Sequence, residues 1–300
     1  MRKPAGPRSS AKKNRTNVRL SSVKLALRGL TAVSPALASH AAGALFRLPP
    51  VRARVEAEVQ ALATAKTERL RSAFGDSVAT WSWGEGPPVL LVHGWGSRGG
   101  RLASYVPALL DRGYSVVTFD APGHGASSGR LSSAPQFVKA IEAVSARFGP
   151  FAAVIAHSMG GCAVSLAMRD GVRAGRAVFI APSANPGAFT TLFAQTLGLP
   201  EEVMNRMRRR FERQFGYGWE EFDVTRFVDR FQTPLLVFHD QDDREVPWSD
   251  GAAIARAWPG ARLITTHGLG HKRIVEDPEV VAKVLDFLRP QPQVAGAAVI

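Results

Sequence analysis

The chain has 300 residues, of which 45% are hydrophobic, and carries a formal net charge of +13 at pH 7. This length can bury one large core within one or two domains. The single cysteine, Cys162, excludes an intramolecular disulfide, and the lack of any uninterrupted 18-residue apolar stretch argues against a transmembrane helix.

The positive charge is concentrated at the start of the chain. Residues 1–30 contain nine Lys and Arg and no acidic residue, which leaves +4 for the remaining residues. Because Pro, Ser and Asn dilute this segment, we predict that residues 1–30 form a basic, disordered tail. The tail could contact anionic membranes weakly and without specificity, although a solvated basic extension is the favoured interpretation. It contains no motif for specific nucleic-acid recognition.

A helical extension is predicted for residues 31–66. It contains two helices, over 35–48 and 51–66, which Pro49-Pro50 separates and which pack outside the main core. A signal peptide is not indicated, because Arg28, Pro35 and other polar residues interrupt the candidate apolar region. We therefore expect a cytoplasmic protein.

Residues 67–289 predict one continuous α/β domain. The segment 67–83, broken at Gly75-Asp76, is expected to enter the sheet as an antiparallel hairpin. Six further apolar runs alternate with helical patterns, which predicts a mostly parallel sheet with helices on both faces. These runs cover residues 88–93, 114–119, 151–156, 177–181, 234–239 and 261–266. Residues 290–300 are predicted to be a flexible tail.

The third run leads directly into the sequence Ala156-His157-Ser158-Met159-Gly160-Gly161. This pattern predicts a buried strand, a sharp turn with Ser158 at its tip, and then a helix. A strained turn of this kind lifts a serine hydroxyl above the sheet, where it can act as a nucleophile. The neighbours two before and two after the serine must be small. Gly160 meets this need, and Ala156 stands where the G-x-S-x-G pattern has its first glycine.

Two loops that precede Ser158 add to the predicted site. The strand at 88–93 runs into the turn Gly94-Trp95-Gly96, and acyl transfer needs two backbone N–H groups aimed at the developing oxyanion. We predict that Trp95 and Met159 are these two donors. The second loop, Phe119-Asp120-Ala121-Pro122-Gly123-His124-Gly125, is a tight turn in which Asp120 and His124 are interpreted as structural.

The acid and the base are expected after the serine, in the chain order Ser, Asp or Glu, His. The strand at 234–239 runs into Asp240-Gln241-Asp242-Asp243, and the strand at 261–266 runs into His267-Gly268-Leu269-Gly270-His271. Asp243 fits the acid best, because its D-x-x-V-P spacing places it at the turn before the next helix. Asp242 is a close rival, and Asp240 is interpreted as satisfying loop amides. His271 is the predicted base, whereas His267 is interpreted as a packed or satisfied imidazole.

With these motifs in place, the sequence resembles an α/β-hydrolase-fold serine hydrolase. It is similar in particular to the bacterial AB hydrolase-1, or serine aminopeptidase S33-like, group. The resemblance covers roughly residues 67 to 289 and implies Ser158 as nucleophile, Asp243 as acid and His271 as base. The matching text is V-L-L-V-H-G-W-G, F-D-A-P-G-H-G-A-S-S-G, A-H-S-M-G-G, H-D-Q-D-D-R-E-V-P and G-L-G-H.

About fifty residues separate the strand that ends near Ala181 from the strand that starts at Pro234, which is more than a usual connection needs. We predict that this insert forms a small helical cap, about residues 183–232, over the catalytic edge. A cap of this kind excludes water and supplies an apolar acyl or alcohol pocket. Its arginines are interpreted as solvating the outer face. The arginines concerned are Arg206, Arg209, Arg210 and Arg213.

Together these patterns predict an enzyme that hydrolyses a carboxylic ester through an acyl-enzyme on Ser158, with amide, lactone and thioester bonds left open. Two alternatives use the same pocket. One is hydrolysis of a carbon–carbon bond by the same triad, and the other is a non-catalytic receptor for a small molecule. No zinc-ligand spacing and no G-x-G-x-x-G before a helix is present, so we infer no metal and no nucleotide cofactor. The expected partner is a small ester-like substrate.

Overall fold

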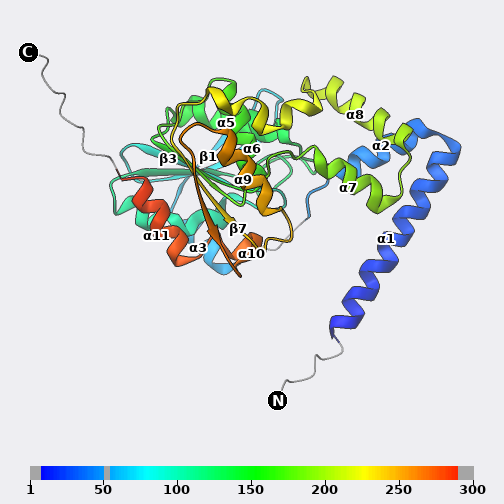
Figure 1. Ribbon diagram of the computed structural model, residues 1–300, viewed down its shortest axis with the longest axis horizontal. Helices are drawn as coiled ribbons and strands as arrows, with labels where there is room; N and C mark the ends of the chain where they lie inside the picture. The colour runs from blue at the N-terminus through cyan, green and yellow to red at the C-terminus, as the bar shows by residue number, and fades with distance from the viewer. Residues whose placement is uncertain (1–7, 51–54, 290–300) are drawn as a thin grey trace, which may run out of the picture. The chain divides into compact units, whose positions relative to one another are not determined.

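The computed structural model describes the backbone of residues 8–50 and 55–289, with side chains described from residue 20 onward (Figure 1). The described residues form two compact units. The helical unit contains those within Met1–Leu48 and Pro186–Phe222, and the sheet unit contains those within Pro49–Asn185 and Asp223–Ile300. Among the described residues, no helix has both the length and the apolar character needed to cross a membrane.

The sheet unit is built on one eight-stranded sheet in the order β1-β2-β4-β3-β5-β6-β7-β8. The hairpin of β1 and β2 is antiparallel, and β2 pairs antiparallel with β4. All later neighbours are parallel, which confirms the predicted mostly parallel sheet. The strands are β1 Lys66–Arg71, β2 Ser77–Trp83, β3 Pro88–Val92, β4 Ser115–Phe119, β5 Ala153–His157, β6 Ala177–Ile180, β7 Leu235–Asp240 and β8 Arg262–Thr266.

Helices cover both faces of the central strands. On one face, Leu91, Ile155 and Val178 join a core that includes Val280 and Val284 of helix α11, Pro278–Phe287. The residues that alternate with them along the strands, such as Leu90 and Val154, are also fully buried. Because alternate residues of a strand point to opposite faces, both faces of the sheet are covered, as the predicted pattern of apolar runs requires.

Most helices of the sheet unit connect successive strands, whereas α3 precedes β1, and α10 and α11 follow β8 (Figure 1). Several begin at side-chain caps that the sequence supplies: Ser133 caps α5, and Asp277 caps α11. The helices are α3 Glu56–Ala63, η1 Gly99–Tyr105, α4 Val106–Leu110, α5 Ala134–Phe148, α6 Met159–Arg169, η3 Val224–Arg226, η4 Val228–Arg230, α9 Trp248–Ala257, α10 Gly270–Arg273 and α11 Pro278–Phe287.

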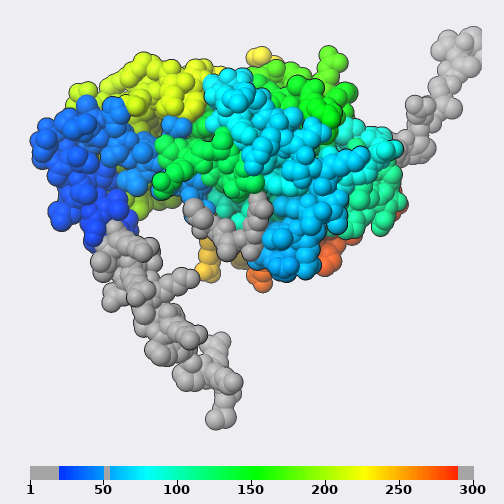
Figure 2. Space-filling model, turned by 180° about the vertical axis from the view of Figure 1, so that it is seen from behind, coloured from blue at the N-terminus to red at the C-terminus, as the bar shows by residue number. Residues whose placement is uncertain are grey.

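The helical unit joins segments that are far apart in the sequence (Figure 2). Ala38 and Ala42 of α2 pack with Val203, Met204 and Met207 of α8. The predicted insert therefore shares a core with the N-terminal helices, a pairing that we did not predict. The helices are α1 Arg8–Val33, α2 Pro35–Phe46, α7 Ala188–Leu197, α8 Glu201–Phe215 and η2 Trp219–Phe222.

Three features of the predicted domain organisation differ from the structure. The second helix of the predicted extension, over 51–66, corresponds to α3, and its Leu62 joins the core of the sheet unit instead of packing outside it. The predicted disordered tail over residues 1–30 overlaps α1, a single helix from Arg8 to Val33. No proline interrupts this stretch, and its many Ala, Leu, Lys and Arg residues favour helix. The predicted cap at 183–232 is divided at Phe222, because η3 and η4 belong to the sheet unit. Residues 1–7 and the predicted flexible tail at 290–300 lie outside the described residues, and the placement of a cap over the catalytic edge stays a prediction.

Candidate active site

Ser158 occupies the turn between β5 and α6. Its backbone has φ 56° and ψ −127°, a conformation that costs free energy for any residue with a side chain. The surrounding backbone is packed closely enough that two glycines are required. A Cβ on Gly160 would lie 2.7 Å from the carbonyl oxygen of His93, and a Cβ on Gly94 would lie 2.7 Å from the Cβ of Ser158. The predicted strand–turn–helix is therefore present, with Ser158 at its tip.

His271 reaches Ser158 from the other side of the site. It lies on α10, just after β8, and its Nε2 is 3.0 Å from Ser158 Oγ. Its Nδ1 is 2.7 Å from Oδ2 of Asp243, which follows β7. Because β5, β7 and β8 run parallel, the loops after them meet at one edge of the sheet. The structure thus brings the three predicted residues into one chain of hydrogen bonds.

The side chain of Asp243 is fully buried and surrounded by hydrogen-bond donors. Its Oδ1 accepts the backbone N–H groups of Glu245 and Val246 at 2.8 and 3.0 Å, while its Oδ2 faces His271. Burial alone would raise the pKa of Asp243, but hydrogen bonds from His239 and His271 and from this backbone hold it well below its ordinary value. The carboxylate is therefore ionised throughout the neutral range.

The two rival aspartates have other partners. Asp242 Oδ2 accepts the backbone N–H of Gly268 at 2.9 Å. Asp240 accepts the N–H groups of Asp242 and Leu269 and the hydroxyl of Thr266, so it satisfies loop amides as predicted. Of the three, Asp243 is the one that contacts His271.

His239, the penultimate residue of β7, was not predicted from the sequence. It is fully buried, and its Nε2 lies 3.1 Å from the carbonyl oxygen of Val246 and 3.5 Å from Asp243 Oδ2. Since a carbonyl can only accept a hydrogen bond, Nε2 of His239 carries the proton. The same N–H group also lies near the carboxylate of Asp243. Among the described residues, His239 Nδ1 has no hydrogen-bond partner, and Gly251 packs against it where a Cβ would lie only 2.4 Å away. His239 therefore approaches the same oxygen of Asp243 that faces His271.

His157 is a second missed residue, one position before the serine. Its Nε2 donates to the backbone carbonyl of His271 at 2.9 Å, and the two rings lie 4.7 Å apart. Burial, together with the neighbouring His271, lowers the pKa of His157 to about 3. The imidazole is neutral at neutral pH and holds the segment that carries His271. Its place inside the A-H-S motif was the only available signal.

The loop that carries Trp95 is fixed by two neutral histidines. His93 Nε2 accepts the N–H of Ala121 at 2.9 Å, and His124 Nε2 accepts the N–H of Gly96 at 3.0 Å. Burial lowers the pKa of His93 to about 4 and that of His124 to about 3, so both nitrogens stay free to accept. The ring of Trp95 stands edge-on to His124 at 5.4 Å.

Asp120 holds the same loops through its carboxylate. Its two oxygens accept the N–H groups of Gly99 and Ala126 at 2.8 and 2.7 Å, and a Cβ on Gly125 would collide with it. The structural interpretation of Asp120 and His124 therefore agrees with their contacts. Gly94, next to Trp95, lies against Ser158, and Met159 is the first residue of α6. Both predicted oxyanion donors thus belong to segments that adjoin the serine.

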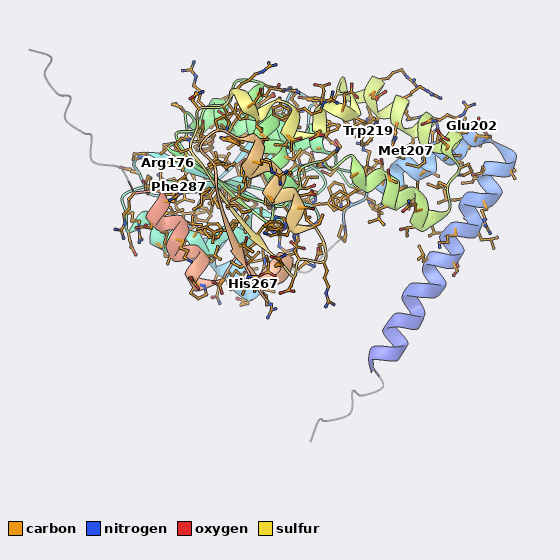
Figure 3. The ribbon with its side chains drawn as sticks, viewed as in Figure 1. Arg176, Glu202, Met207, Trp219, His267 and Phe287 are labelled. Carbon is orange, nitrogen blue, oxygen red and sulfur yellow. The ribbon has the colours of Figure 1, made fainter. Side chains whose placement is uncertain are left out.

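Two remaining predictions can be compared with the structure. His267 was interpreted as a packed or satisfied imidazole, but this is wrong: its side chain is exposed at the end of β8 (Figure 3). Strand β8 is the edge of the sheet, so the residue that follows it can face solvent. Cys162 is buried in α6, and burial raises the pKa of its thiol, which fits a packing role.

Known proteins share this architecture. A non-heme haloperoxidase from Rhodococcus erythropolis is 27% identical over 270 residues, covering 71% of this chain and 96% of that protein. A solved hydrolase from Pseudomonas aeruginosa PA01 has a TM-score of 0.59 at 24% identity, covering 75% of this chain and 99% of its own. The esterase RhEst1 from Rhodococcus sp. ECU1013 has a TM-score of 0.56 at 21% identity, covering 74% and 98%. At these identities the structural likenesses show the fold alone.

A family model decides the assignment. The model of the alpha/beta hydrolase family matches residues 89–284, which is about two thirds of the chain and includes every strand from β4 to β8. The matched stretch contains Ser158, Asp243 and His271. This chain is an enzyme of the alpha/beta hydrolase family.

Proposed function

We propose that the protein is a serine esterase that hydrolyses a carboxylic ester through an acyl-enzyme on Ser158. One observation carries the proposal. The hydroxyl of Ser158, on its strained turn, is 3.0 Å from His271 Nε2, while His271 Nδ1 is 2.7 Å from a buried carboxylate. This arrangement matches the roles of nucleophile, base and orienting acid. Two solved proteins of the same fold are named as esterases, so we choose an ester as the first bond to test.

In the first half of the proposed reaction, Ser158 Oγ attacks the ester carbonyl carbon while His271 Nε2 takes the hydroxyl proton. Asp243 keeps the proton of His271 on Nδ1 and stabilises the imidazolium. The backbone N–H groups of Trp95 and Met159 are the proposed donors to the carbonyl oxygen, which becomes negatively charged. When the carbon–oxygen bond breaks, His271 gives its proton to the leaving alkoxide, and an alcohol departs from the acyl-enzyme.

In the second half, a water molecule replaces the alcohol. His271 takes one proton from the water, and the resulting hydroxide attacks the acyl carbon. The tetrahedral intermediate collapses, His271 returns the proton to Ser158 Oγ, and a carboxylic acid is released. One ester and one water thus give one acid and one alcohol, and His271 ends each cycle unchanged.

Covalent labelling tests the nucleophile. A fluorophosphonate should add once to the full chain, and intact-mass and peptide analysis should find the adduct on Ser158. Ser158→Ala should abolish labelling. Ser165→Ala is a matched control on α6, the helix that follows Ser158, because Ser165 is buried and its hydroxyl donates to the carbonyl of Gly161 at 2.9 Å. Labelling of Ser158→Ala equal to that of the unmodified chain would refute the assignment.

A panel of chromogenic esters of graded acyl length tests the reaction. Turnover that Ser158→Ala removes would support an esterase and would give the preferred acyl length. Labelling without turnover of any ester, amide, lactone or thioester would instead favour the carbon–carbon hydrolase, for which a diketone is the substrate to test. If the chain shows no labelling and no turnover of any of these substrates, that result would favour the non-catalytic receptor.

A further inference from the structure

The helical unit carries a surface that differs from the rest of the protein. It has 85 of the 300 residues, yet it holds seven of the ten large hydrophobic side chains that are exposed among the described residues. It also holds fifteen Lys and Arg against five Glu, which is a net +10 of the chain's +13. The seven side chains are Leu20, Leu25, Val33, Leu37, Leu45, Leu48 and Leu192.

Helix α2 is apolar on both sides. Its inner face, with Ala38 and Ala42, packs in the core of the helical unit. Leu37, on the side away from that core, is 55% exposed, and Leu45, at the edge of the core-facing side, is 37% exposed. These two residues are eight apart, so they lie within about 80° of each other around the helix. A helix at a water-facing surface normally has a polar outer face, and α2 contains no charged residue.

Helix α1 adds apolar and basic groups to this surface. Leu25 and Val33, again eight residues apart, are 73% and 82% exposed. Lys24 and Arg28 lie in the same stretch of helix, and the first acidic residue of the whole chain is Glu56. Exposed apolar side chains beside cations, with no acid among them, complement the apolar and anionic groups at the surface of a bilayer that contains anionic lipids.

We propose that the exposed apolar faces of α1 and α2, defined by Leu25, Val33, Leu37 and Leu45, bind the surface of a membrane that contains anionic lipids. The apolar side chains enter the boundary between headgroups and acyl chains, and the Lys and Arg residues of the unit pair with lipid phosphates. The charge of the unit favours this occupant over a second copy of the chain, which would bring another net positive surface. It is also favoured over nucleic acid, because exposed leucines cannot stack on bases.

Vesicle binding by the full chain tests the proposal. Vesicles of phosphatidylcholine alone are compared with an equal mixture of phosphatidylcholine and phosphatidylglycerol in a sedimentation assay. Binding should be at least about tenfold stronger to the mixed vesicles and should weaken as salt is added. Leu37→Ser with Leu45→Ser should lower the affinity about tenfold, and Lys24→Gln with Arg28→Gln should lower it by a similar factor.

The controls separate lipid binding from loss of structure. Val59→Ser changes an exposed apolar residue of α3 in the sheet unit and should leave binding unchanged. All variants should keep their circular dichroism and their turnover of a small soluble ester, since none touches the candidate active site. If the α2 pair does not fold, Leu25→Ser with Val33→Ser tests the same surface from α1.

Three results would overturn the proposal. The first is equal binding by the leucine variants and the unmodified chain. The second is that duplex DNA displaces the protein fully from vesicles and binds the leucine variants as strongly as the unmodified chain. That result would assign the surface to nucleic acid. The third is no vesicle binding together with a dimer, measured by light scattering, that the leucine substitutions dissociate.

Discussion

Replacing Asp243 with asparagine tests the proposed site most sharply, because the contacts of Asp243 determine how the new amide must sit. Oδ1 accepts two backbone N–H groups, from Glu245 and Val246. The amide oxygen of Asn must stay at that position, since an NH₂ group there would face two donors. The NH₂ group then takes the place of Oδ2 and points at His271 Nδ1.

The consequence is a wrong tautomer of His271. A donor at 2.7 Å from Nδ1 is tolerated only when Nδ1 is an acceptor, so the remaining proton moves to Nε2. Nε2 then faces Ser158 Oγ at 3.0 Å with a proton of its own and cannot take the serine proton. In serine proteases, the same replacement of the triad aspartate by asparagine lowers kcat by about 10⁴ for this reason. We expect a loss of similar size here, on the order of 10³–10⁴, with KM little changed.

Asp242→Asn is the matched control. It removes the same charge one residue away, and Asp242 accepts only the N–H of Gly268 in the contacts described. An amide oxygen can accept that bond equally well, so kcat should fall by less than about threefold. Steady-state kinetics on one chromogenic ester, with urea unfolding to compare stability, measure both variants. Equal losses in the two variants, or a larger loss for Asp242→Asn, would refute the role of Asp243.

Three further outcomes are expected. Ser158→Ala should remove ester turnover down to a residual rate of roughly 10³–10⁴ over water, with the unfolding free energy unchanged within about 1 kcal/mol, and near-normal turnover would contradict the nucleophile. His239→Phe should lower kcat about tenfold with KM unchanged. His239→Gln keeps a donor near Asp243 and should recover part of that loss. Equal kinetics in the two variants would contradict a positioning role for His239. The unfolding free energy should fall as the pH is lowered below about 6.5. Three buried histidines have pKa values of about 3 to 4 in the folded protein, so in this range they bind protons only after unfolding. Urea titrations measure the effect, and an unfolding free energy that stays constant between pH 7 and 5 would contradict it.

The sign of the pH effect follows from the direction of the shifts. A histidine whose pKa is lowered by folding stabilises the native state fully above its unfolded pKa of about 6.5. That stability is lost as the pH falls toward the folded pKa, at about 1.4 kcal/mol per pH unit for each histidine. Replacing His124 with Gln, which keeps an acceptor for the N–H of Gly96, should therefore flatten the slope. The stability that the ionised carboxylate of Asp243 contributes is lost only at lower pH than this, since its pKa lies below the ordinary aspartate value.

The sequence predicts the fold and the three candidate residues because both depend on local patterns. Strands β3 to β8 read as apolar runs, since a parallel strand is covered on both faces. Ser158 follows β5 directly, Asp243 and His271 lie in the short segments after β7 and β8, and parallel strands end at one edge of the sheet. The choice of Asp243 over Asp242 rested on turn spacing, and the structure gives Asp243 the contact with His271.

The features that were missed depend on contacts between distant segments. The pairing of α2 with α8 brings Ala42 and Met207 together across more than 160 residues, and no local pattern specifies which apolar faces meet. His239 carries no spacing signal, because a histidine at the end of a strand resembles any satisfied core histidine. The helix at Arg8–Val33 was missed because charge and composition were weighed above the absence of prolines.

The hydrogen bonds of the buried histidines explain why one of them is the proposed base. Four of them form a hydrogen bond with a backbone carbonyl or a backbone N–H. Each of these four is fixed in one tautomer and stabilises a loop, and none of them contacts a side-chain hydroxyl in the hydrogen bonds described. His271 differs, because one ring nitrogen faces the hydroxyl of Ser158 and the other faces the carboxylate of Asp243. An imidazole that bridges a hydroxyl and a carboxylate can accept a proton at one end while its charge is balanced at the other. The four that hold loops are His93, His124, His157 and His239.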